Sequence, residues 1–306
     1  MPSPTDFNLS PYFDDFSESK KFHRVLFRPA FAVQARELTQ SQTQLQNQIE
    51  RFGDHIFKHG SMVIPGNIGL DLEYYAVKLT SIDSSNTLAQ FTTGTILTGG
   101  TSGVTAEVVN TVALSGSDPD TIYVKYNKTG SNNSSAVFSD SETITGTNSD
   151  SVALSAVVST TATGSAATVK QGVYYINGFF VQCDDATLIL DKYTNTPSYR
   201  IGFTITESFV TSNDDSTLND NATGSSNVNA PGAHRFKILL TLAKKTLAST
   251  EDSTFVELMR VENGTIKAEA RSTDYSILGE TLARRTFDES GDYVLTNPEF
   301  DVREHL

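Results

Sequence analysis

The stretch that decides the fold is Phe31–Lys58, FAVQARELTQSQTQLQNQIERFGDHIFK. Two series of residues run through it, each with a period of seven and offset by four: Phe31, Leu38, Leu45 and Phe52, and Ala35, Gln42, Ile49 and Ile56. This is the a/d spacing of an amphipathic helix over about four heptads. The sequence therefore predicts one long helix over residues 31–60, in which Gln42 interrupts the apolar side and Gly53 weakens the last turn.

The apolar side of this helix, formed by Leu38, Leu45, Ile49, Phe52 and Ile56, is called the apolar stripe below. It has two interpretations. In the first, the stripe lies on a sheet of its own domain, as in most amphipathic helices. In the second, it is a subunit interface that joins copies of the chain in a homo-oligomer. The spacing alone does not choose between them.

Residues 1–30, called the arm below, precede the helix and are predicted to be extended. Prolines at positions 2, 4, 11 and 29 exclude a regular helix there. Aromatic side chains recur along the segment, and a segment this irregular needs a surface on which to bury them. We expect the arm to dock on a partner and to bury four aromatic residues at a subunit interface: Phe13, Phe16, Phe22 and Phe27.

After the helix the pattern changes to β-strands. Leu70–Leu79 and Gly172–Val181 are bulky and aromatic, whereas residues between them are rich in Ser, Thr, Gly and Val. Short alternating runs separated by turn clusters are typical of a small barrel or sandwich. We predict a discontinuous β-rich core, residues 61–87 and 161–306, into which a small β domain, residues 88–160, is inserted. Later strands are expected at Ala186–Leu190, Tyr199–Ile205, Arg235–Leu242 and Phe255–Glu262, and a short helix at Ile277–Arg285.

The composition agrees with a mainly β, α+β fold. Charged residues make up 19% of the 306 residues and the net charge is −13. An acidic chain is disfavoured as a partner of nucleic acid, which needs a basic surface, and of anionic membranes. No stretch is long and apolar enough to span a membrane, and the first residues lack the features of a signal peptide. The single cysteine, Cys183, excludes an internal disulfide and is typical of a protein made in a reducing cytoplasm.

Few residues are arranged for chemistry. His55 and His59 have metal-ligand spacing, but Ile56 occupies the position where a zincin motif has Glu. The loop Asn213–Asn221 is rich in oxygen atoms but lacks the spacing of a calcium loop, so its side chains are expected to cap their own backbone. Asp184 and Asp185 beside Cys183 oppose its activation, which favours a thiol at the edge of the core. We therefore predict no enzyme, no cofactor and no metal.

Several motifs resemble a known family. They begin with Ser10–Phe16 (SPYFDDF), Phe27–Pro29 (FRP) and Ala35–Gln40 (ARELTQ), and continue with Gln48–Gly53 (QIERFG), Asn229–Ala233 (NAPGA) and Ala283–Asp292 (ARRTFDESGD). In this order and spacing they resemble virion structural proteins of tailed phages. That family is common in contractile-tailed phages, including cyanophages, and is described as baseplate- or tail-associated with an uncharacterised domain. The resemblance covers about two thirds of the chain, but residues 88–160 match it only in general style.

The resemblance implies a location in the virion tail or baseplate, after synthesis in the host cytoplasm. It implies no catalytic residue. The expected function is a structural one, a tail, baseplate or fibre-attachment scaffold that docks neighbouring subunits, including copies of itself. The alternative is a receptor-binding tail fibre whose inserted β domain touches the host. Because phage tails have three-fold and six-fold symmetry, a trimer is the expected homo-oligomer.

Overall fold

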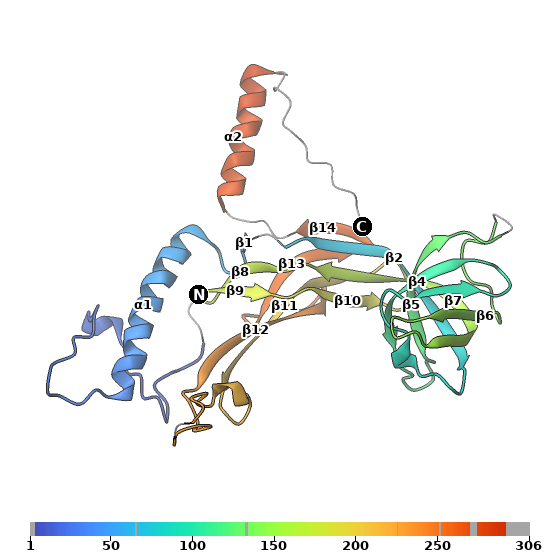
Figure 1. Ribbon diagram of the computed structural model, residues 1–306. Helices are drawn as coiled ribbons and strands as arrows, with labels where there is room; N and C mark the ends of the chain where they lie inside the picture. Colours follow the sequence, from blue (N-terminus) through green and yellow to red (C-terminus); the bar gives the residue numbers. More distant parts are fainter. Residues whose placement is uncertain are drawn as a thin grey trace. The chain divides into compact units, whose positions relative to one another are not determined.

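The computed structural model describes residues 4–64, 66–131, 134–224, 226–250, 252–269 and 274–291, without the side chains of 274–280. Strands hold 43% of the residues and helices 15%, which confirms the predicted mainly β fold with a helix near the N-terminus. The chain divides into two compact units (Figure 1): unit 1 is Met1–Pro65, Tyr174–Phe180 and Arg271–Leu306, and unit 2 is Gly66–Val173 and Val181–Ala270. In the described part of the chain no helix is long and apolar enough to cross a membrane.

Unit 1 contains the predicted long helix, α1 (Ala35–Ile56), which is shorter at both ends than expected. It begins after Gln34, whose backbone N–H donates to the Glu37 carboxylate in a capping box. Phe31 precedes this cap. It lies in a turn in which the Phe31 N–H donates a hydrogen bond to the Arg28 carbonyl. The arm before α1 is irregular apart from a short 3-10 turn, η1 (Glu18–Lys20).

A small sheet follows α1, with strand order β1-β8-β9: β1 is Met62–Ile64, β8 is Gly172–Ile176 and β9 is Phe179–Cys183. The prediction of one strand over 172–181 was wrong. Asn177 and Gly178 both have positive φ, 49° and 84°, and form the two-residue turn of a hairpin. An Asn-Gly pair is the strongest local signal for such a turn, and here it overrides the continuous run of apolar residues around it.

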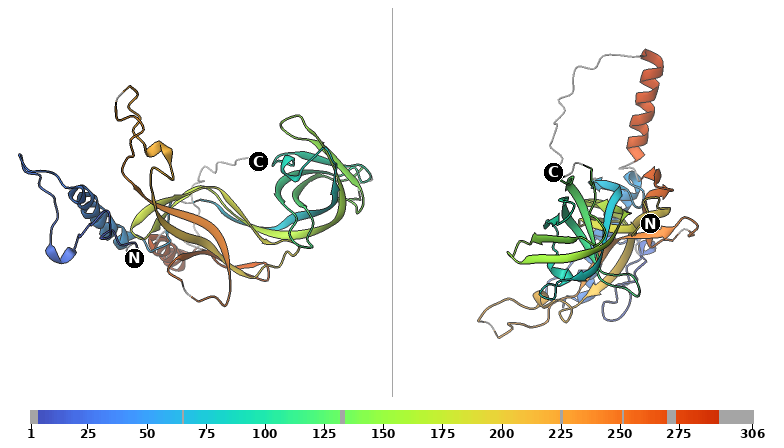
Figure 2. Two further views of the ribbon diagram at one scale, coloured as in Figure 1. Left: turned by 90° about the horizontal axis from the view of Figure 1, so that it is seen from below. Right: turned by 90° about the vertical axis from the view of Figure 1, so that its right-hand side faces the viewer.

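Unit 2 contains a closed antiparallel barrel, drawn in cyan to green in Figure 2. Its strands are β2 (Ile68–Ile82), β3 (Ile96–Gly99), β4 (Thr105–Val112), β5 (Thr121–Lys128), β6 (Thr143–Thr147) and β7 (Ala153–Val169). They pair in the order β7-β2-β5-β4-β3-β6, and β6 pairs with β7 to close the ring. A 3-10 turn, η2 (Leu88–Gln90), lies between β2 and β3. Closure leaves no free sheet edge in the ring.

The structure corrects the predicted limits of the inserted domain. Val77 and Leu79 of β2 are buried in the barrel core together with Val158 of β7, although 61–87 was assigned to the other domain. β2 and β7 are long strands that pair from Ile82↔Ala156 to Ile68↔Val169. The barrel therefore shares two strands with the rest of unit 2. A boundary at residue 160 cuts through β7, and a boundary at residue 88 separates β2 from the barrel strands with which it pairs.

The remainder of unit 2 is a second layer. β10 (Ala186–Asp191) extends the barrel sheet beside β7. A separate sheet has the order β12-β11-β13-β14, formed by β11 (Tyr199–Val210), β12 (Arg235–Thr246), β13 (Phe255–Glu262) and β14 (Thr265–Glu269). The two layers share a core that contains Ala167, Leu190, Ile201, Met259 and Val261. All four late strands that the sequence predicted are present.

Two elements complete the described chain. η3 (Ser216–Leu218) lies in the loop between β11 and β12. The predicted helix at 277–285 is confirmed within α2 (Asp274–Ser290), which ends where Gly291 adopts a positive φ of 66°. The predicted core beyond Gly291 lies outside the described residues.

Candidate docking surface

The apolar stripe of α1 lies on the exposed side of the helix. The exposed fractions of Leu38, Leu45, Ile49 and Phe52 are 51%, 67%, 45% and 66%, and Ile56 at the end of the helix is half-buried. Of the 23 large apolar side chains that are exposed in the described part of the chain, eleven lie between Leu9 and Phe52. An exposed apolar concentration of this kind is typical of an interaction surface.

The other sides of α1 are polar, and they contact the β8–β9 hairpin and the arm of unit 1. Gly53 lies against the buried ring of Tyr175. The Tyr175 hydroxyl is 2.9 Å from the Glu50 carbonyl and 2.9 Å from the Asp54 carboxylate, to which it donates. Gln46 Nε2 donates to the Gly178 carbonyl at 2.7 Å. The first interpretation of the stripe, packing on a sheet of its own domain, is therefore not what the chain does.

The arm is also held to α1 by polar contacts. Asp14 is buried and accepts a hydrogen bond from the Thr43 hydroxyl, and Asp15 accepts one from Gln40. Glu18 accepts hydrogen bonds from Asn47 and Arg51, and these two donors hold the pKa of the Glu18 carboxyl below its usual value. Hydrogen bonds to the carboxylates of the arm therefore anchor it to α1.

The predicted aromatic residues of the arm remain accessible in the single chain. Phe13, Phe22 and Phe27 are more than half exposed, and Phe16 is half-buried. Their burial at a subunit interface stays a prediction. The structure brings Phe16 and Phe22 to α1 but leaves Phe13 and Phe27 away from that contact.

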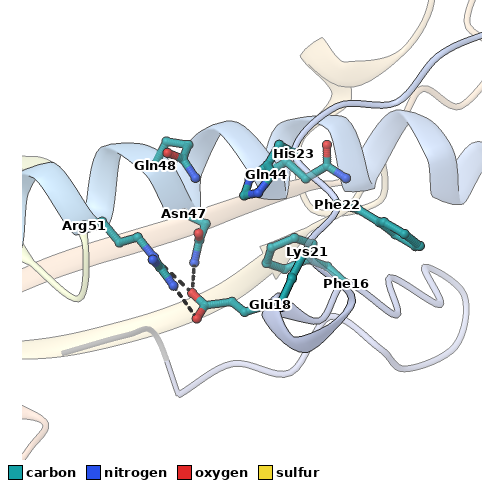
Figure 3. Close-up of a pocket in the computed structure, with 9 residues that line it drawn as sticks. All are labelled: Phe16, Glu18, Lys21, Phe22, His23, Gln44, Asn47, Gln48 and Arg51. Carbon is teal, nitrogen blue, oxygen red and sulfur yellow. Dashed lines mark hydrogen bonds and ion pairs between the residues drawn. The ribbon is translucent and has the colours of Figure 1, made fainter.

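Phe16 and Phe22 line a pocket of about 180 Å³ between the arm and α1 (Figure 3). The arm contributes a mixed wall of aromatic and charged side chains, and α1 contributes amides and a guanidinium. The lining residues are Phe16, Glu18, Lys21, Phe22, His23, Gln44, Asn47, Gln48 and Arg51. The Glu18–Arg51 ion pair lies along one side of it, so the pocket is part of the arm–helix attachment.

The residues considered for chemistry have structural partners. His59 is partly buried, which lowers the pKa of its imidazole, and its Nδ1 accepts the Asn177 N–H at 3.3 Å, whereas His55 is exposed. Among the described residues, no three His, Cys, Asp or Glu side chains are grouped to hold a metal ion. Cys183 is buried, and burial raises the pKa of its thiol, in agreement with a thiol at the edge of the core.

The acidic loop between β11 and β12 caps its own backbone, as the sequence predicts. Asp214 accepts hydrogen bonds from the N–H and hydroxyl of Thr211, and Asp215 accepts the same pair from Thr217. Asp220 accepts from the Ala222 N–H. These bonds hold the pKa values of Asp214 and Asp215 below the usual value, because the bonds favour the charged form.

Sequence reasoning missed the residues that attach the arm and the hairpin to α1. The partners of Asp14, Asp15 and Glu18 lie 25 to 33 residues away, so no local spacing reveals them. The Asn177-Gly178 pair, in contrast, is a turn signal that the sequence contains. It does not show that the hairpin lies beside α1, because that contact is tertiary.

Comparison with known families assigns the chain to one of them. The model of a family described as a domain of unknown function, DUF4815, matches residues 10–129 and 122–302. The chain therefore belongs to the DUF4815 family. Searches of curated proteins and of solved structures find no match.

Proposed function

We propose that this chain is a non-catalytic structural component of a phage tail or baseplate, which docks neighbouring subunits through α1. The observation that carries the proposal is the orientation of α1. Its polar side is occupied by the hairpin and the arm of its own chain, and its apolar stripe is left exposed. The motifs that resemble tailed-phage virion proteins supply the biological setting.

The stripe has the energetic capacity for such a role. Burying a large apolar side chain contributes roughly 1.5–3 kcal/mol, so the four exposed members of the stripe are sufficient to stabilise an interface. The heptad positions that flank the stripe hold no Asp, Glu, Lys or Arg: they are Thr39, Ser41, Gln46, Gln48, Gly53 and His55, of which Gln46 and Gly53 contact the hairpin. Copies of α1 side by side would thus meet no like-charge repulsion at these positions, which favours pairing of the chain with itself.

The location can be tested on purified particles of the phage that encodes the chain. An antibody raised against the purified protein should label the tail or baseplate in electron micrographs, and mass spectrometry should find the chain in the tail fraction after disassembly. Label confined to the tips of fibres would favour the receptor-binding alternative. Absence of the chain from washed particles would overturn the proposal.

A further inference from the structure

The charges of the chain are unevenly distributed at the start of α1. The segment Ser19–Arg36, called the basic loop below, contains five of the 23 Lys and Arg residues and none of the 36 Asp and Glu residues. The basic residues are Lys20, Lys21, Arg24, Arg28 and Arg36. The rest of the chain has 18 basic and 36 acidic residues, a net charge of −18, against +5 for the basic loop. Asp15 pairs with Lys20 and Arg36, so the charge that the loop offers a partner rests on Lys21, Arg24 and Arg28.

The basic loop also presents apolar side chains to solvent. Phe22, Leu26, Phe27, Phe31 and Val33 are all more than half exposed, and Leu26 reaches 76%. The guanidinium of Arg28 lies 4.3 Å from the centre of the Phe31 ring, so cationic and aromatic groups form one surface. A partner that covers this surface must tolerate both apolar contact and positive charge.

The basic loop is held at both of its ends. Before it, Glu18 is bonded to Arg51 and Asn47 of α1. At its other end, Gln34 and Glu37 form the capping box of α1. A segment fixed at two points loses less conformational entropy on docking than a free tail does, so more of the contact energy appears as affinity.

We propose that the basic loop docks on the acidic surface of a second copy of this chain. The sign of the charge selects the partner, because complementary charges steer association and like charges oppose it. The loop between β11 and β12 is such an acidic surface, and every copy carries it: Ser212–Gly232 contains Asp214, Asp215 and Asp220 and no Lys or Arg, and Asp214 and Asp215 are exposed. Nucleic acid is another anionic partner, and the experiment below separates it from a second copy of the chain. This docking is separate from the tail role proposed above and does not depend on it.

Sedimentation velocity on the full chain at about 50 mM and about 500 mM salt tests the proposal, because salt shortens the range of such charge pairing. The variant is Arg24→Glu with Arg28→Glu. The matched control is Lys125→Glu with Lys128→Glu, two exposed lysines of β5 that produce the same change in net charge. All three proteins are first checked for an unchanged thermal transition.

The parent should associate more weakly at the higher salt concentration. The Arg24/Arg28 variant should associate about tenfold or more weakly than the parent at low salt and show little salt dependence, since like charges then face each other. The lysine control should behave as the parent. Apolar pairing through α1 is not weakened by salt, so the two contacts are distinguishable.

Three results would overturn the proposal. The first is a parent that remains monomeric at both salt concentrations, and the second is equal weakening by the lysine control, which would assign the effect to net charge. The third comes from fluorescence polarisation with a labelled single-stranded oligonucleotide. If the parent binds the oligonucleotide and the Arg24/Arg28 variant does not, the basic loop is a nucleic-acid-binding segment instead.

Discussion

Gly53 of α1 and Tyr175 of the β8–β9 hairpin are packed so closely that no side chain fits between them. A Cβ at position 53 would lie 2.5 Å from Cε2 of the Tyr175 ring. The ring is fully buried and its hydroxyl is bonded to Glu50 and Asp54, so it has little freedom to move away. Glycine at this position is therefore a packing requirement of unit 1 rather than a weak point of the helix.

Gly53→Ala should lower the stability of the protein by about 1–3 kcal/mol, the usual cost of overpacking. The direction of the stability change is informative, because alanine in an unconstrained helix is favoured over glycine by about 1 kcal/mol. A loss of stability therefore indicates the close contact with Tyr175. Thermal unfolding followed by circular dichroism measures the effect. Gln42→Ala, an exposed position on the same helix, is the control and should be neutral or slightly stabilising. A higher melting temperature for Gly53→Ala would show that the contact with Tyr175 is not present.

Leu45→Asp combined with Ile49→Asp should separate subunits that associate through the apolar stripe, because isolated carboxylates resist burial. Light scattering should give a mass above the 33.2 kDa of one chain for the parent and a smaller mass for the variant. The control is Leu114→Asp with Ile96→Asp in unit 2, whose exposed fractions of 65% and 46% match the 67% and 45% of the stripe pair. An unchanged mass in the stripe variant would show that the stripe joins no subunits.

The barrel should be removable only together with the strand segments that it shares. Joining Ser85 to Thr163 through a Gly/Ser linker deletes β3–β6 and the first part of β7, and it leaves Val77 and Leu79 of β2 without the core that covers them. That deletion should abolish a cooperative thermal transition.

A longer deletion that joins Glu73 to Gly164 also removes the barrel half of β2, which the shorter deletion leaves in place. It keeps the ladder from Ile68↔Val169 to Asp71↔Ala166, and it should retain a cooperative transition. Calorimetry on both deletion variants measures whether each unfolds in a cooperative transition. If the shorter deletion unfolds cooperatively, residues 88–160 are a separable domain after all.

Asp118 ties the loop before β5 to the outside of the barrel, and its contribution to stability should depend on pH. Its carboxylate accepts from Lys192 at 2.8 Å and also contacts Tyr193 and Lys78. These donors, Lys192 first, lower the pKa of Asp118 from 3.8 to about 2. A lowered pKa in the folded state means that the stabilisation is present above the unfolded value and is lost as the pH falls through the folded value.

Asp118→Asn should therefore melt below the parent near neutral pH, and the difference should shrink between pH 3.8 and about pH 2. Thermal unfolding across this range is the measurement. Asp140→Asn, at an exposed turn of the barrel, removes the same charge and serves as the control. A constant difference between parent and Asp118→Asn at every pH would rule out the ionised carboxylate as its cause.

The strands were predicted unevenly, and the failures have physical reasons. Strands whose residues alternate, such as Tyr199–Ile205, were predicted correctly because a period of two requires only local information. The predicted domain boundary at residue 160 falls inside β7, Ala153–Val169, because its small residues give no local sign that the strand continues until β2 pairs with it. Tertiary pairing, rather than composition, makes this segment one strand.

For the candidate site, the sequence determined which residues form the apolar stripe, since the period of seven places Leu38, Leu45 and Phe52 on one side of any helix. It also determined the mainly β class and the positive charge of the basic loop. It did not determine which side of α1 its own chain would cover. That was decided by Tyr175, Gly178 and Glu18, which are distant in sequence and reach the polar side of α1 only after folding. Because hydrogen bonds and a close glycine contact hold that side, the apolar stripe is left exposed for a partner.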